Sequence, residues 1–451
     1  MTSHRLPALA LLCAAALAAG CEEVEQVRDR YRDLTPHEAY LASLSDAGLA
    51  ETALVGDWIA AGHAAVAGAP LVQLPFQEEG FIAPEEAGAM AWRVRIGRGQ
   101  RLTGEVTLTS PEGTRVFVDL FRLPEEEGDP IRPVLAVDTV PGDFAYEPWR
   151  EGDFILRVQP ELLRGGRYRV TLRLEAQLAF PVEGRDERAV GSTWGSPRDG
   201  GRRSHEGIDI FAPRGTPVLA TADGTVNRVR ETRLGGKVVW LRDTVRNASI
   251  YFAHLDSQHV VSGQRVRRGD TLGFVGNTGN ARTTSPHLHF GMYRRGEGAV
   301  DPFPFIRRPR GGALADLTAD LDRLGSWVRM RDGGIRLRVA PGLASDVTAE
   351  LERHTPLRVL GGSGDWYRVR LPDGTVGYVA ARLTEATDRP LETRLALAGD
   401  ALQAAPEPSA PVVGPLPEGA SLPVLGRFGG YLMVQAPGGR TGWMGDSGAQ
   451  P

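Results

Sequence analysis

Hydrophobic and polar residues alternate through much of the segment from Ala91 to Leu174. Because successive side chains of a strand point to opposite faces, a period of two predicts strands that are buried on one side only. The alternation is clearest in Trp92-x-Val94-x-Ile96, Val116-x-Val118-x-Leu120, Phe154-x-Leu156-x-Val158 and Tyr168-x-Val170-x-Leu172-x-Leu174. This pattern predicts an antiparallel β-sandwich over residues 79–182.

Two other segments have the spacing of helices. Thr35-Pro36-His37-Glu38 combines a capping residue, a first-turn proline and a glutamate three residues after the cap, which is typical of a helix start. We expect helices to continue to about Ala67, within a helical and linker region over 21–78. A second stripe, over 311–328, predicts a linker helix. Its members are Leu314, Leu317, Leu321 and Leu324.

The last third of the chain contains a repeat at a constant offset of 65 residues. Val359-Leu360-Gly361 recurs as Val424-Leu425-Gly426, and Gly377-Tyr378 recurs as Gly442-Trp443. The other matching landmarks are Leu337 to Pro341 with Leu402 to Pro406, Trp366 with Tyr431, and Val369 with Val434. Alternating valine and leucine with frequent glycine and proline predict two copies of a small β-barrel, over 329–385 and 390–447.

The composition and charge of the chain set broad limits. Its 451 residues, 41% of them hydrophobic, are enough for several domains with separate cores. A formal net charge of -4 argues against nucleic acid as a partner. The chain as a whole is therefore expected to be mostly β and multidomain, with a short N-terminal helical region.

The N-terminus has the pattern of a secretory signal. Arg5 precedes an apolar run from Leu6 to Leu17, and Ala18-Ala19-Gly20-Cys21 follows. Residues 1–20 are interpreted as a signal peptide. The sequence around Cys21 resembles a bacterial lipobox, which implies lipidation at Cys21, and Glu22 after it favours the outer membrane. Plain secretion is the alternative.

Four of the nine histidines lie in three short motifs within ninety residues. His205 is followed by Asp209, His254 lies in Tyr-Phe-Ala-His-Leu, and His287 and His289 flank a single leucine. In a strand, His287 and His289 project to the same side, so one can bind a metal while the other faces a substrate. Histidine and aspartate side chains are zinc ligands, and a catalytic zinc keeps a position open for water. The motifs predict metal-assisted hydrolysis.

The segment from Gly191 to about Ile306 resembles the LytM/lysostaphin-type zinc metalloendopeptidases, which cut peptidoglycan peptides. The resemblance rests on Ser192-Thr193-Trp194-Gly195, His205-x-x-x-Asp209, Tyr251-x-Ala253-His254-Leu255, Gly276-x-Thr278-Gly279 and His287-Leu288-His289-Phe290. It implies a peptidase domain over 185–308, built on an antiparallel sheet. It also implies that His205, Asp209 and His289 bind one zinc ion and that His254 and His287 serve catalysis. Residues that bind the substrate are not identified by the sequence.

Both C-terminal copies resemble bacterial Src-homology-3-like domains, which implies binding to wall peptides. In the second copy Ala404 and Ala405 replace the arginine-rich start that is usual for such domains, so we expect wall-peptide binding less from this copy. For the aromatic residues Trp366, Tyr367, Tyr378 and Trp443, a place in the barrel core is favoured over contact with a ligand.

These resemblances imply a zinc endopeptidase that hydrolyses peptidoglycan cross-links of the D-alanyl-diaminopimelate type. Cleavage of a glycyl bond is the alternative. The implied location is the periplasmic side of the cell envelope, with a lipid anchor in the outer membrane. The alternative is a wall-binding regulator or scaffold that positions other hydrolases. A third interpretation is a latent enzyme, whose N-terminal helices or linker helix cover the cleft until a protein regulator removes them.

Overall fold

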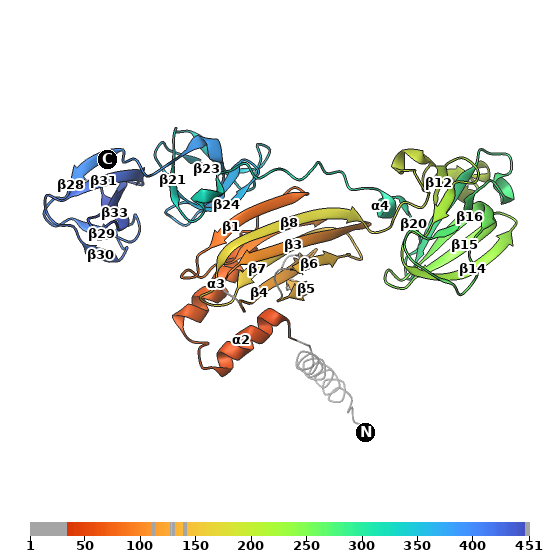
Figure 1. Ribbon diagram of the computed structural model, residues 1–451, viewed down its shortest axis with the longest axis horizontal. Helices are drawn as coiled ribbons and strands as arrows, with labels where there is room; N and C mark the ends of the chain where they lie inside the picture. The colour runs from red at the N-terminus through yellow and green to blue at the C-terminus, as the bar shows by residue number, and fades with distance from the viewer. Residues whose placement is uncertain (1–33, 111–112, 127, 129–130, 139–141, 447–451) are drawn as a thin grey trace, which may run out of the picture.

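The computed structural model describes residues 34–110, 113–126, 128, 131–138 and 142–446. The expected signal peptide and Cys21 lie outside these residues. As predicted, the protein is mostly β and multidomain. Figure 1 shows a β-sandwich in the middle, a second β domain at one end and two small barrels at the other. Among the described residues, no helix is long and apolar enough to cross a bilayer.

Two helices precede the sandwich. They are α2 (Pro36–Asp46) and α3 (Ala53–Ala67). The predicted start at Thr35 is confirmed, because its side chain accepts from the Glu38 N–H and Glu38 in turn accepts from the Thr35 N–H. Trp58 of α3 is 2% exposed and donates from its indole N–H to Pro160 O at 2.8 Å. The helices therefore pack on the sandwich.

The sandwich consists of two antiparallel sheets around one apolar core. One sheet has the order β2-β7-β4-β5, and the other contains β1-β8-β3-β6. The strands are β1 (Phe76–Ile82), β2 (Met90–Ile96), β3 (Gln100–Thr109), β4 (Val116–Arg122), β5 (Arg132–Val137), β6 (Gly142–Tyr146), β7 (Gly152–Pro160) and β8 (Gly166–Ala176). The boundary expected between 78 and 79 falls inside β1. Strand β1 lacks the apolar alternation of the other strands because two of its buried residues, Glu78 and Glu79, are acids that pair with arginines of other strands.

The third unit is a ten-stranded antiparallel sheet with a short helix, α4 (Phe303–Ile306). Its main order is β17-β14-β15-β16-β19-β12-β9, with β18 beside β16 and β20 beside β19. The strands are β9 (Val190–Ser192), β12 (Ile208–Phe211), β13 (Pro217–Leu219), β14 (Gly224–Thr232), β15 (Gly236–Asp243), β16 (Ala248–Gln258), β17 (Arg265–Val266), β18 (Thr271–Val275), β19 (His287–Arg294) and β20 (Gly298–Val300). A separate hairpin joins β10 (Pro197–Arg198) to β11 (Arg203–Ser204).

The C-terminal strands reproduce the repeat seen in the sequence. The first barrel contains β21 (Trp327–Met330), β22 (Ile335–Arg338), β23 (Val347–Leu351), β24 (Pro356–Ser363), β25 (Trp366–Arg370), β26 (Val376–Ala380) and β27 (Thr384–Ala386). The second contains β28 (Glu392–Leu395), β29 (Ala401–Gln403), β30 (Val412–Pro415), β31 (Ser421–Phe428), β32 (Tyr431–Gln435) and β33 (Thr441–Gly445). Strands β24, β25 and β26 start 65 residues before β31, β32 and β33.

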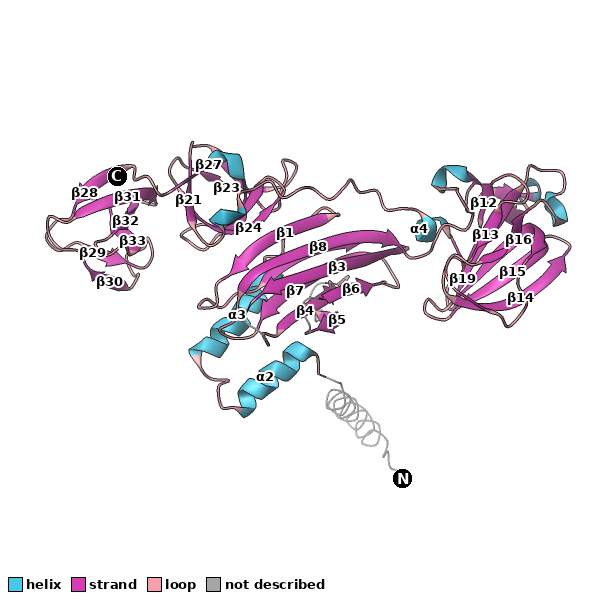
Figure 2. Cartoon of the chain, viewed as in Figure 1, coloured by secondary structure: helices cyan, strands magenta, loops and turns pink. Residues whose placement is uncertain are grey.

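The first barrel is joined to the sandwich through a shared sheet. Strand β1 pairs with β8 on one side and with β24 on the other, so that Glu79 lies opposite Gly362. The two units thus share an eleven-stranded sheet. Figure 2 shows this barrel directly against the sandwich. The sandwich and first barrel are therefore held together by backbone hydrogen bonds as well as side chains.

The predicted linker helix over 311–328 is wrong. Residues 308–318 have no regular structure, and only a 3-10 turn, Leu321–Arg323, forms within the range. The N–H groups of Thr318 and Ala319 donate to Gly364 O instead of to the preceding turn. An extended chain covers over twice the distance per residue that a helix covers, which suits a segment that must pass along the sandwich to the barrel (Figure 1).

The ten-stranded domain contacts the other end of the sandwich. The Arg294 guanidinium lies 3.4 Å from the centre of the Trp149 ring. Arg246 pairs with Glu147 at 2.7 Å. In addition, Arg98 of the sandwich pairs with Glu297 at 2.6 Å. The sandwich thus contacts a separate β unit at each of its ends.

Candidate metal and catalytic site

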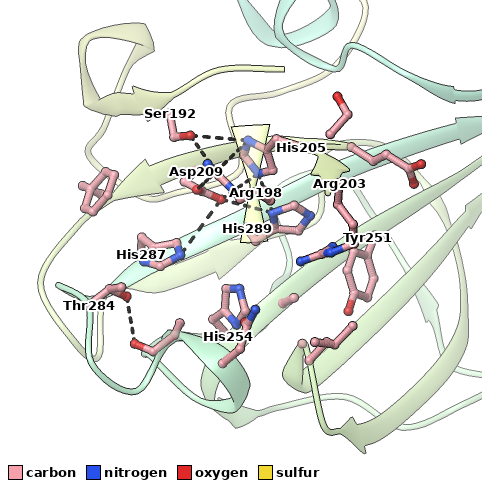
Figure 3. A pocket seen from close by; sticks show the side chains of 18 of the residues that line it. Ser192, Arg198, Arg203, His205, Asp209, Tyr251, His254, Thr284, His287 and His289 are labelled. Atoms are coloured by element: carbon pink, nitrogen blue, oxygen red, sulfur yellow. Dashed lines mark hydrogen bonds and ion pairs between the residues drawn. The ribbon is translucent and has the colours of Figure 1, made fainter. Parts of the chain in front are cut away.

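A cavity of about 750 Å³ opens on one face of the ten-stranded sheet. All the residues that line it lie between Ser192 and Tyr293. Figure 3 shows His205, Asp209, His254, His287 and His289 gathered in this cavity. The structure therefore brings together all five residues that the sequence motifs singled out.

Strand pairing explains how three of these residues share one face. Strands β12 and β19 are antiparallel, with Asp209 opposite His289. His287 and His289 point into the cavity, whereas Leu288 between them is fully buried in the core. The prediction that the two histidines project to one side and Leu288 to the other is confirmed.

His205, Asp209 and His289 form a compact set of metal-binding groups. His205 Nε2 lies 3.0 Å from His289 Nδ1 and 3.1 Å from Asp209 Oδ1. His289 Nδ1 lies 3.1 Å from the same carboxylate oxygen. Two imidazole nitrogens and one carboxylate oxygen are a usual protein donor set for catalytic zinc. The three residues therefore fit a zinc ion.

The surroundings favour the protonation states that metal binding needs. His205 Nδ1 lies 3.0 Å from Thr193 O, so that Nδ1 donates there and Nε2 keeps its lone pair. Burial opposes ionisation of Asp209, but the adjacent imidazoles of His205 and His289 outweigh it and hold the pKa of this carboxyl well below its usual range. Burial also lowers the pKa of His289. A carboxylate and neutral imidazoles are the ligand forms.

His254 and His287 lie beside this set with their rings 5.0 Å apart. Each donates from Nδ1 to a backbone carbonyl, His254 to Thr278 O at 2.9 Å and His287 to Ser285 O at 2.8 Å. Both are therefore held in the form whose Nε2 can accept a proton. Burial lowers the pKa of His254 to about 4, with further lowering by His287 and His289, which keeps its imidazole neutral at pH 7.

A β-bulge directs His254 into the cavity. The pairing of β15 with β16 shifts between Lys237 and Val239, so Ala253 and His254 both stand opposite one partner residue. His254 has a φ of 62°, a left-handed conformation that side chains other than glycine seldom adopt. In a regular strand His254 would share the core face with Phe252. No residue pattern in the sequence indicates this bulge, and a bulge is a common way of turning a side chain toward a site.

Further residues of the cavity were missed by the sequence reasoning. Arg198, from the hairpin β10–β11, reaches Asp209 Oδ2 and Ser192 Oγ, each at 2.7 Å (Figure 3). It lies between two recognised motifs, in a stretch without periodicity, so only proximity in space reveals it. The cavity is also lined by Phe211, Tyr251 and Tyr293.

The residues at the cavity mouth test the interpretation that the N-terminal helices or the linker cover the site. Asn280, Ala281 and Thr284 line the cavity, so the segment 277–285 borders it. The lining includes no residue of α2, of α3 or of the segment after α4. Among the described residues, neither the N-terminal helices nor the linker covers the cavity.

Comparison with known proteins agrees with this geometry. Residues 203–302 match Peptidase family M23, and residues 333–385 match the bacterial SH3 domain. The chain is 42% identical over 140 residues to the L-Ala--D-Glu endopeptidase of Bacillus subtilis, covering 29% of this chain and 43% of the relative. It is 38% identical over 94 residues to peptidoglycan DD-endopeptidase ShyC of Vibrio cholerae, covering 21% of each.

A solved structure of similar sequence is the catalytic domain of lysostaphin from Staphylococcus simulans, at 31% identity and a TM-score of 0.24. That match covers 26% of this chain and 89% of the other. The chain spans less than half the length of the two curated relatives. The matched segments lie over the cavity domain and the first barrel, so this chain carries a peptidase domain of family M23 and a bacterial SH3 domain.

Proposed function

We propose that this protein is a zinc-dependent endopeptidase that hydrolyses peptide cross-links in bacterial peptidoglycan. The observation that carries the proposal is the convergence of His205, Asp209 and His289, whose donor atoms lie 3.0 to 3.1 Å apart, beside two histidines with fixed tautomers. The M23 match over the same residues supports it.

His205 Nε2, His289 Nδ1 and Asp209 Oδ1 would hold the metal. A zinc ion bound there supplies a water of lowered pKa and polarises the scissile carbonyl. The His205 bond to Thr193 O sets which ring nitrogen faces the metal. The three protein ligands leave room in the cavity for water and a peptide.

His254 and His287 would move protons. Because each Nδ1 donates to a backbone carbonyl, each Nε2 can accept a proton from the attacking water. The resulting imidazolium then donates from Nε2, either to the oxygen of the tetrahedral intermediate or to the departing amine. Two histidines 5.0 Å apart allow one to assist attack while the other stabilises charge.

We propose cross-links of the D-alanyl-diaminopimelate type as the substrate. Arg203 and Glu206 line the cavity, and such charged groups suit a stem peptide with carboxylate and amine groups. A glycine bridge offers no side-chain charge to bind. The relative from Vibrio cholerae is named a DD-endopeptidase, whereas one from Staphylococcus capitis is named a glycyl-glycine endopeptidase.

The alternative proposal is a wall-binding regulator or scaffold that positions or activates other hydrolases. It is favoured by the two C-terminal barrels, because a bacterial SH3 domain suits attachment to the wall. The five residues at the cavity are all present, which favours the enzyme. For either role we propose a location on the periplasmic side of the cell envelope, with lipidation at Cys21 anchoring the chain in the outer membrane.

Digestion of purified sacculi tests the proposal. The full chain should release peptide fragments whose masses identify the bond that is cut. An Asp209→Ala variant should release none, while Asp223→Ala, outside the cavity, serves as a control that keeps activity. Fragments from the Asp209→Ala protein, or none from a zinc-loaded wild type, would contradict the enzyme.

A further inference from the structure

A short hairpin stands at one edge of the metal-binding set. Strands β10 and β11 pair Pro197 with Ser204 and Arg198 with Arg203. The turn between them contains Gly200 and Gly201, with φ of 69° and 90°, values that suit glycine. Next to it, the His205 N–H donates to Ser196 O at 2.9 Å, which ties the start of this hairpin to a proposed zinc ligand.

The hairpin carries Arg198 against the aspartate ligand. One terminal nitrogen of Arg198 lies 2.7 Å from Asp209 Oδ2 and 2.7 Å from Ser192 Oγ. It also lies 2.9 Å from His205 Nδ1; because that nitrogen donates its own hydrogen to Thr193 O, this contact is not a hydrogen bond. The Asp209 side chain is 12% exposed and that of Arg198 is 30% exposed, so solvent weakens this ion pair only in part.

The two oxygens of Asp209 thus have separate partners. Oδ2 faces Arg198, whereas Oδ1 faces the nitrogens of His205 and His289. A carboxylate with a free Oδ2 could rotate about its Cβ–Cγ bond and lose this arrangement. Hydrogen bonds from neighbouring groups commonly fix metal ligands in this way.

We infer that Arg198 is a positioning residue for the metal site: it holds Asp209 Oδ2 so that Oδ1 stays directed at the metal. This inference rests on the proposed zinc site, and it adds a role that the sequence motifs do not assign. Arg198 acts through Asp209 and is not itself a ligand, because a guanidinium remains protonated and offers no lone pair.

The positive charge of Arg198 could instead weaken zinc binding, which is the alternative to a positioning role. A guanidinium repels a divalent cation, so on charge alone its removal would strengthen zinc binding. Positioning predicts weaker binding instead. The sign of the change in zinc affinity therefore decides between the two roles.

The test measures the zinc dissociation constant of the full chain by competition with a chromophoric chelator, with no substrate present. Arg198→Met keeps the bulk but removes the charge and the donors, and it should bind zinc about 10 to 100 times more weakly. Arg198→Lys, which can still donate to Oδ2, should recover part of the loss. Arg202→Met removes a charge from the same hairpin outside the cavity and should bind like the wild type.

Zinc affinity in Arg198→Met that equals or exceeds the wild-type value would overturn the inference. So would a loss of equal size in Arg202→Met. Equal thermal midpoints of the metal-free proteins show that the variants fold. Because no substrate is used, a wild type that binds zinc but cuts nothing would contradict the proposed function alone.

Discussion

The hydroxyl of Tyr378, in the first barrel, donates a 2.7 Å hydrogen bond to the carboxylate of Glu78 in the sandwich. Glu78 is fully buried, accepts a second bond from Tyr168 and lies 3.3 Å from Arg368. Trp443, the counterpart of Tyr378 in the repeat, is 4% exposed and packs near Trp327 of the first barrel. Both aromatic residues are buried against the preceding unit, so wall peptides would have to contact another part of each barrel.

Glu78→Ala should loosen the first barrel from the sandwich. Removing the carboxylate leaves Arg368 buried without its partner, which costs about 3–5 kcal/mol in the free energy of unfolding. The matched control is Glu86→Ala, because Glu86 also pairs with a barrel residue, Arg370, but at the surface. That loss should be about 1 kcal/mol or less. Urea unfolding measures both, and equal losses would contradict the importance of the buried cluster.

Acid should weaken the packing of α2 on the sandwich. His37 stacks on Trp58 and lies 3.2 Å from Gln159 Oε1. Burial, with a smaller contribution from Arg157, lowers the pKa of His37 to about 4. The unfolded chain, with its ordinary histidine pKa near 6.5, then takes up a proton more readily than the folded chain. Stability from this residue is complete above about pH 6.5 and is lost as the pH falls toward 4.

The size of this effect is at most about 3 kcal/mol, because one pKa unit corresponds to about 1.4 kcal/mol. The free energy of unfolding, measured from pH 8 to pH 4.5 for the wild type and for His37→Gln, checks it. The variant should show a smaller decrease over this range. Identical pH dependence in the two proteins would contradict the assignment to His37.

Replacement of His254 should separate chemistry from metal binding. His254→Ala should lower kcat by about 10² to 10⁴, the usual contribution of a general acid or base. Zinc content should remain unchanged, because His254 Nδ1 donates to Thr278 O and its ring is outside the three-residue set. His259→Ala, five residues further along and outside the cavity, is the control. Loss of zinc from the His254→Ala protein would make this residue a ligand instead.

The roles of the five site residues were implied by the resemblance to the LytM/lysostaphin-type peptidases, whereas other parts of the prediction depend on local patterns in the chain. The positions of His287 and His289 on one face follow from the period of a strand, and the repeat of 65 residues follows from identities along the chain. The bulge at His254 and the contact of Arg198 with Asp209 depend on neighbouring strands, which no local pattern records. The leucines from Leu314 to Leu324 had helical spacing, but Ala319 packs into the core of the first barrel and the backbone bonds to Gly364.

Zinc titration of the metal-free full chain tests the central claim most directly, with release of peptide fragments from sacculi as the measured quantity. We expect no release without metal, full release at one zinc per chain, and no recovery in a His289→Ala variant at the same zinc concentration. Release that is unaffected by metal removal, or that is retained by His289→Ala, would contradict a zinc peptidase built on His205, Asp209 and His289.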